Sequence, residues 1–68
     1  MNLTFGELYR LKRTRAGLSV KQIGHRTGFH FATIAKWERE KSSWKELPYG
    51  WLERLAQALD CSVDEIKN

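Results

Sequence analysis

The sequence predicts an all-α fold, a compact bundle of five short helices in one domain over residues 1–68. Apolar residues recur at helical spacing in five segments, and glycines or capping residues separate these segments. No segment shows the alternation of a β-strand. The chain of 68 residues has five glycines and one proline, which argues against disorder and indicates one small domain.

The first two helices are predicted over residues 4–16 and 20–27. Thr4 can cap the first, with Glu7 three residues later as in a capping box. Gly17 can end this helix in a left-handed conformation.

The second helix is expected to begin after its cap, Ser19, and to end at Gly28. Gly24 lies in its middle, where glycine costs about 1 kcal/mol relative to alanine. We therefore expect another helix to approach closely at Gly24.

The third helix is predicted over residues 30–39. Ile34 and Trp37 share one face, which we assign to the core. The segment 40–48 has no clear period and is interpreted as a loop, with an extension of the third helix into it as the alternative. The opposite face of the helix carries Phe31, Ala32, Lys36 and Arg39.

The fourth and fifth helices follow a proline. Pro48 suits the first turn of a helix that runs to Leu59. Asp60 and Cys61 break it. Ser62 then caps a short last helix through Ile66, whose acidic first turn suits the helix dipole.

Basic residues are concentrated in the first two thirds of the chain. The net charge is +4 and the isoelectric point is near 9.6. Residues 1–45 carry ten basic and three acidic side chains, whereas residues 46–68 carry two basic and five acidic ones. Such a distribution steers one face toward polyanions such as nucleic acids. Ordinary solvated surface is the alternative, and charge alone leaves both open.

The sequence predicts neither an enzyme nor a cofactor or metal site. Phosphate-binding glycine loops and the HExxH and GxSxG motifs are absent, and His25, His30 and Cys61 lack metal-ligand spacing. The single cysteine, Cys61, excludes an internal disulfide and favours a cytoplasmic location. We expect no membrane association, because no apolar run approaches the roughly 20 residues of a spanning helix.

Residues 19–39 have the pattern of a helix-turn-helix, in which two short helices meet at a tight turn with a glycine at the corner. Phe29 is expected to fill the corner from inside. The outer face of helix 30–39 would then be free to enter a major groove. A wider resemblance rests on Gly17, Leu18, Ser19, Ile23, Gly24, Gly28, Phe29, Thr33, Ile34, Trp37 and Glu38, and on Leu52, Leu55, Ala56, Leu59 and Ser62–Ile66.

In these residues the chain resembles the phage-repressor and Cro-like (lambda-repressor-like) helix-turn-helix family, over about residues 5–39 and 48–67. The resemblance implies that Arg13 and Glu38 form a structural ion pair and that Cys61 is a buried thiol. It implies that Ser19 faces the DNA backbone; a plain N-cap is the alternative, compatible interpretation. The expected base-reading residues are Phe31, Ala32 and Lys36, and the expected backbone contacts are Ser19, Lys21, Gln22, His30, Thr33, Arg39, Lys41 and Ser42.

The chain departs from the family pattern at three positions. Val20 stands where the family often has a glutamine that bridges a phosphate and the recognition helix, so Lys21 or Gln22 would have to substitute. Glu40 replaces the glycine that commonly follows the third helix. His30 replaces the usual Ser or Thr cap.

Several side chains have two interpretations. Phe31 is either a core residue or a contact to thymine methyl groups, and its register favours the second. Lys36 either donates to guanine O6 and N7 or is solvated. Trp51 is a candidate for the core, whereas Trp44 and Tyr49 are candidates for an exposed patch of the kind that often marks a partner surface.

The sequence therefore predicts a sequence-specific regulator of transcription, a repressor, that binds an inverted-repeat operator in double-stranded DNA as a homodimer. The dimer surface is expected near residues 44–51 and the last helices. We expect no small-molecule effector. The alternative is an antitoxin or accessory subunit with the same fold, whose main contact is another protein.

Overall fold

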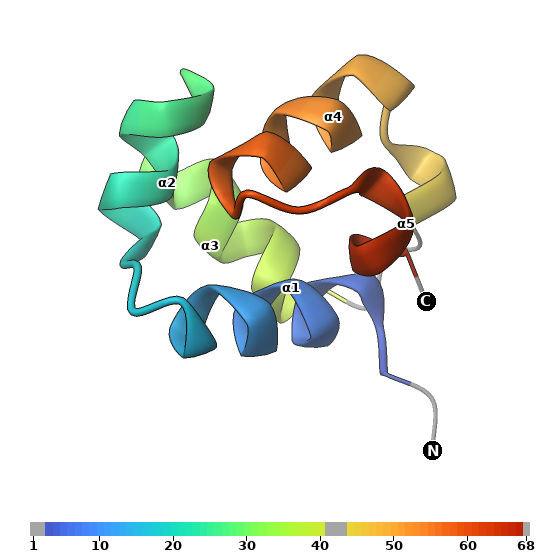
Figure 1. Cartoon of the computed structure of the whole chain (residues 1–68), viewed down its shortest axis with the longest axis horizontal. Coiled ribbons are helices and arrows are strands. Elements are labelled where there is room, and N and C mark those ends of the chain that lie inside the picture. Colours follow the sequence, from blue (N-terminus) through green and yellow to red (C-terminus); the bar gives the residue numbers. More distant parts are fainter. Residues whose placement is uncertain (1–2, 41–43, 68) are drawn as a thin grey trace.

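The computed structural model describes residues 3–40 and 44–67, and it confirms the all-α fold (Figure 1). The described part contains no strand, and its Cα atoms extend over 29 × 22 × 21 Å. A 3₁₀ turn precedes the fourth helix. The elements are α1 (Phe5–Arg15), α2 (Val20–Thr27), α3 (Phe31–Arg39), the 3₁₀ turn (Trp44–Glu46), α4 (Tyr49–Ala58) and α5 (Val63–Ile66).

The predicted signals at the ends of α1 and α2 are confirmed. Thr4 Oγ1 accepts a hydrogen bond from the Glu7 amide at 3.1 Å, and Glu7 Oε1 accepts one from the Thr4 amide at 2.9 Å. Gly17 and Gly28 adopt positive φ angles of 74° and 84°. These conformations are strained for other residues, so the two glycines fix where the chain turns.

The later boundaries differ slightly from the prediction. α3 begins one residue later because His30 is its N-cap, and it ends at Arg39. Glu40 is extended, with ψ of 150°, so the alternative of a longer third helix is wrong. Pro48 is the N-cap of α4 rather than part of its first turn. α4 ends one residue early, and Asp60 beyond it has a positive φ of 56°.

The hydrophobic core is formed by all five helices. Tyr9 from α1 is buried, and its hydroxyl donates to the carbonyl oxygen of Leu55 in α4 at 3.0 Å. Burial raises the pKa of Tyr9 well above its ordinary value, and the negative charge of Glu38 adds to the shift. The buried apolar residues are Phe5, Tyr9, Ile23, Ile34, Leu52, Leu55, Ala56, Ala58 and Ile66.

Two glycines allow backbones to touch. A Cβ at Gly6 would collide with the carbonyl oxygen of Trp37 and lie 2.8 Å from Glu38 Cα, so α1 contacts the end of α3 directly. A Cβ at Gly24 would lie 2.9 Å from the carbonyl oxygen of Phe29 and 3.4 Å from the Phe31 nitrogen. The expected close approach at Gly24 therefore occurs, but the approaching group is the turn and the first residue of α3.

The aromatic residues near α4 lie differently from the prediction. Trp44 is half-buried against the core, with Lys67 Nζ 4.7 Å from its ring centroid. Tyr49 is 58 % exposed. The predicted exposure is therefore confirmed for Tyr49 and wrong for Trp44. Trp51 is 40 % exposed rather than part of the buried core. Cys61 is only partly buried, although burial still raises the pKa of its thiol.

Candidate nucleic-acid interface

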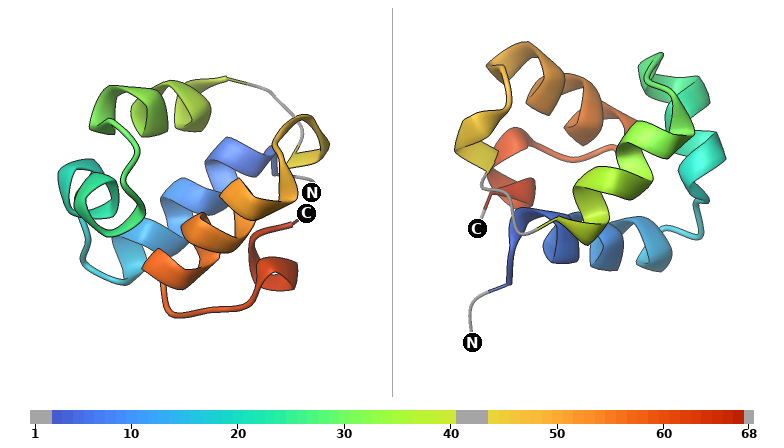
Figure 2. Two further views of the ribbon diagram at one scale, coloured as in Figure 1. Left: turned by 90° about the horizontal axis from the view of Figure 1, so that it is seen from above. Right: turned by 180° about the vertical axis from the view of Figure 1, so that it is seen from behind.

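The turn between α2 and α3 is held by a buried threonine. Thr27 Oγ1 donates to the carbonyl oxygen of Ile23 at 2.8 Å and accepts from the amide of Phe29 at 3.2 Å. Gly28 supplies the left-handed residue between them. Figure 2 shows the two helices joined at this corner, with α3 crossing the molecule so that its last turn lies against the first half of α1.

α3 has one side in the core and one side in solvent. Ile34 is 1 % exposed, and Trp37 packs edge-on against Phe29 with 5.3 Å between the ring centroids. The residues of the opposite side are spaced by three and four positions, which places them on one stripe of the helix. The exposed residues of α3 are Phe31, Ala32, Lys36 and Arg39.

The end of α3 is fixed to α1 by the ion pair that the resemblance implied. Arg13 Nε donates to Glu38 Oε2 at 2.7 Å, and Nη2 donates to Oε1 at 2.9 Å. The third nitrogen, Nη1, donates to the carbonyl oxygen of Leu18 at 2.8 Å. The hydrogen bonds to Glu38 raise the pKa of Arg13. The pair therefore joins α1, the segment before α2, and α3.

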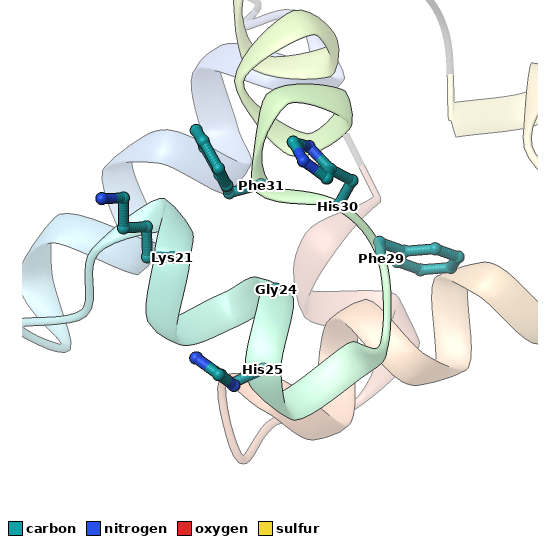
Figure 3. Close-up of a pocket in the computed structure, with 6 residues that line it drawn as sticks. All are labelled: Lys21, Gly24, His25, Phe29, His30 and Phe31. Carbon is teal, nitrogen blue, oxygen red and sulfur yellow. The ribbon is translucent and has the colours of Figure 1, made fainter.

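The start of α3 brings together residues from two helices (Figure 3). His30 Nδ1 accepts a hydrogen bond from the amide of Ala32 at 3.1 Å, so His30 caps the helix in place of a Ser or Thr. The His30 and Phe31 rings stack with 4.6 Å between centroids, and Lys21 Nζ lies 5.5 Å from the Phe31 centroid. Phe31 is 41 % exposed, which excludes the core interpretation.

An open depression lies beside this cluster, between α2 and the start of α3. Gly24 contributes no side chain to it, and Figure 3 shows Lys21 and Phe31 on the two helices that flank it. Phe29 points away toward α4. The depression is lined by Lys21, Gly24, His25, Phe29, His30 and Phe31.

The start of α2 is capped in a way that the sequence analysis missed. Ser19 Oγ accepts from the Gln22 amide at 3.2 Å, and Gln22 Oε1 accepts from the Ser19 amide at 2.8 Å. Ser19 is thus an N-cap, and both side chains remain exposed. The side-chain oxygen of Gln22 is engaged in the cap, and its NH₂ group carries the donors that a phosphate could accept. The signal for this box was Gln three residues after Ser.

The remaining candidate residues are distributed along α3 and beyond it. Lys36 Nζ lies 3.7 Å from Glu40 Oε1 in an exposed pair, which is weak enough for Lys36 to take another partner. Arg39 is exposed and Thr33 is half-buried. Lys41 and Ser42, both expected to contact a DNA backbone, lie outside the described residues.

Some of the positive charge in residues 1–45 stabilises the fold. Arg26 Nη1 donates to the carbonyl oxygen of Ala58 at 2.9 Å, at the end of α4, where a cation is favourable. Arg13 is engaged with Glu38. Counting charges cannot separate these two arginines from the other basic residues, because the separation depends on contacts 25 and 32 residues apart in sequence.

Two features, a metal-binding cluster and a membrane-spanning helix, are absent from the described residues. Within residues 3–40 and 44–67, no three His, Cys, Asp or Glu side chains are grouped so that they could hold a metal ion. None of the helices in that part of the chain has the length and apolar character to cross a membrane.

Comparison with known proteins adds one match. The family model described as "Helix-turn-helix domain" matches residues 4–68. No curated protein and no solved structure matches the chain significantly.

Proposed function

Because the chain belongs to the helix-turn-helix domain family, we propose that it binds double-stranded DNA sequence-specifically and regulates transcription as a repressor. The observation that carries the proposal is the two-sided character of α3. One side is anchored by Ile34, Trp37 and the Arg13–Glu38 pair, while the other carries exposed side chains. A major groove admits one α-helix in this orientation.

The stripe along α3 provides the base contacts. Ala32 and Lys36 lie one turn apart, so both can face base edges. Phe31 at the start of the helix offers an apolar surface to a thymine methyl group. The lysine can donate to guanine O6 and N7.

The flanking residues hold the phosphates, which fixes the position of α3 but carries no base information. Ser19, Lys21 and Gln22 lie at the start of α2, and Thr33 and Arg39 lie on α3. His30, at the start of α3, contacts the DNA backbone. Lys41 and Ser42 follow α3 and extend this set by their place in the sequence.

A homodimer on an inverted repeat is the assembly we propose. Two half-sites lie about 34–36 Å apart when they are separated by one helical turn of DNA. The longest extent of the described chain is 29 Å, so two copies side by side can place both α3 helices at that spacing. The dimer contact would involve residues 44–51 and the last helices, where Tyr49 and Trp51 are exposed.

The experiment that tests this function is selection of bound sequences from a random duplex pool. The proposal expects an enriched consensus with twofold symmetry. Failure to enrich any duplex at low salt would contradict sequence-specific binding. A consensus without symmetry would contradict the homodimer while leaving DNA recognition in place.

A second candidate function is that of an antitoxin or accessory subunit that contacts a protein partner. It is favoured by the exposure of Tyr49 and Trp51 on α4, at 58 % and 40 %. This function expects weak DNA binding by the isolated chain and tight binding only with the partner present. Random duplex selection with the isolated chain therefore separates the two candidates.

A further inference from the structure

The depression between α2 and α3 combines an apolar ring with a cation. The Phe31 ring is stacked on His30 at one side, and the Lys21 ammonium lies 5.5 Å from its centroid. Gly24 lines the depression, and the turn and the start of α3 pack directly against its backbone (Figure 3). The contacts on Phe31 still leave 41 % of the residue exposed, so its ring can receive an apolar group from outside.

We propose that this depression is a thymine-reading subsite, in which the Phe31 ring contacts the C5-methyl group and the Lys21 ammonium donates to O4 instead of to a phosphate. The inference rests on the proposed function, because it requires α3 in the major groove. There, thymine presents an acceptor, O4, beside a methyl group, a combination that no other standard base offers. 5-Methylcytosine carries the same methyl group beside an N4 donor, which an ammonium group cannot pair with.

His30 is a positioning residue in this subsite. Its Nδ1 accepts from the Ala32 amide at 3.1 Å, so the proton of the neutral ring is on Nε2. With its orientation fixed by this bond, the imidazole stacks on Phe31 at an interplanar angle of 25°. His30 therefore acts through Phe31, and its expected influence is on discrimination of the methyl group.

The first test uses the selected duplex with each thymine of one half-site replaced in turn by deoxyuridine, which removes only the methyl group. At one position the wild-type chain should bind the deoxyuridine duplex about fourfold more weakly, as expected for one buried methyl-sized group. In Phe31→Ala the ratio at that position should fall to about one. Equal wild-type affinity for all the substituted duplexes overturns the proposal.

The second test distinguishes the role of Lys21 from a phosphate contact. Lys21→Met keeps the length of the apolar stem and removes the charge. It should lose much of the wild-type preference for thymine over 5-methylcytosine at that position while keeping the preference for thymine over deoxyuridine. A uniform loss of affinity on all duplexes, with both preferences unchanged, contradicts the assignment of Lys21 to O4.

The third test separates the two contacts of His30. His30→Asn keeps a side-chain oxygen that can cap α3 but removes the ring, whereas His30→Phe keeps a ring and removes the cap. The thymine-to-deoxyuridine ratio should fall toward one in His30→Asn and persist in His30→Phe. An unchanged ratio in His30→Asn overturns the positioning role. Failure of the proposed function looks different, since no duplex is then selected at all.

Discussion

Arg13 and Glu38 connect α1 to the last turn of α3 through two parallel hydrogen bonds of 2.7 and 2.9 Å. Their side chains are 13 % and 6 % exposed, so water screens the pair only partly. The same guanidinium binds the carbonyl oxygen of Leu18, ahead of α2. One arginine therefore joins α1, the segment before α2 and the last turn of α3.

Removing either partner of this pair should lower stability without changing base preference. Arg13→Ala and Glu38→Ala should each reduce the free energy of unfolding by about 3 kcal/mol, because one charge is left without its partner. Urea unfolding followed by circular dichroism measures this. The control is Glu40→Ala, whose exposed pair with Lys36 should contribute less than about 1 kcal/mol. Two variants as stable as the wild type would show that the pair does not hold α3.

Two glycines should respond oppositely to alanine. Gly6→Ala places a methyl group against the backbone of Trp37 and Glu38, which should destabilise the fold by roughly 1–3 kcal/mol. Gly50→Ala meets nothing within 4 Å and should stabilise α4 by up to about 1 kcal/mol. Thermal unfolding of Gly6→Ala and Gly50→Ala, each compared with the wild type, checks both predictions. Tolerance of Gly6→Ala would contradict the direct contact of α1 with α3.

Tyr9 should make the fold sensitive to alkaline pH. Its pKa is raised by burial, so the folded chain keeps a proton that the unfolded chain loses near the ordinary value of 10.0. The contribution of Tyr9 to the free energy of unfolding is therefore full below pH 10.0. It declines as the pH rises from 10.0 toward the higher pKa of Tyr9 in the folded chain. Unfolding free energies across this range should fall more steeply for the wild type than for Tyr9→Phe. Tyr49→Phe is the exposed control and should follow the wild type.

The salt dependence of DNA binding should distinguish Arg39 from Arg26, whose guanidinium is hydrogen-bonded within the fold. Each phosphate neutralised contributes about −0.9 to the slope of log K against log salt concentration. Arg39→Ala should make the slope shallower by about that amount. Arg26→Ala should lower stability and leave the slope unchanged, because its guanidinium is bound to the end of α4. A wild-type slope near zero would contradict the electrostatic part of the account.

Lys36 should affect base preference in a way that Arg39 does not. Lys36→Ala should relax the preference at one base pair of each half-site by roughly 1–3 kcal/mol. Arg39→Ala should weaken binding to all duplexes alike, as expected for a phosphate contact. Affinities on the selected duplex and its single-base variants measure both. If both variants lost affinity equally on all duplexes, Lys36 would not read a base, and base reading would be left to Phe31 and Ala32.

Much of the fold could be predicted from local signals. The capping box of Thr4 and Glu7, the left-handed glycines and the apolar spacing of α2 to α4 act within a few residues, so the sequence reveals them directly. Boundaries were less certain at His30 and Pro48, because both residues are tolerated either as caps or in the first turn.

The parts that could not be predicted depend on contacts between distant segments. Gly6 looked unremarkable in sequence, since its requirement for a small side chain comes from the backbone at Trp37 and Glu38. Trp44 was expected to be exposed, but the core and Lys67 cover it. At the candidate site, the outward residues of α3 followed from helical spacing. The cluster of Lys21, His30 and Phe31 did not, because it joins two helices across the turn.

The central claim, that α3 and the start of α2 form the DNA-binding surface, is tested most directly by titrating ¹⁵N-labelled protein with the selected duplex. The account predicts that the amide shifts that change most belong to residues 19–22 and 30–39, with smaller changes along α4. Changes confined to α4 around Tyr49 and Trp51, with α3 unaffected, would contradict it.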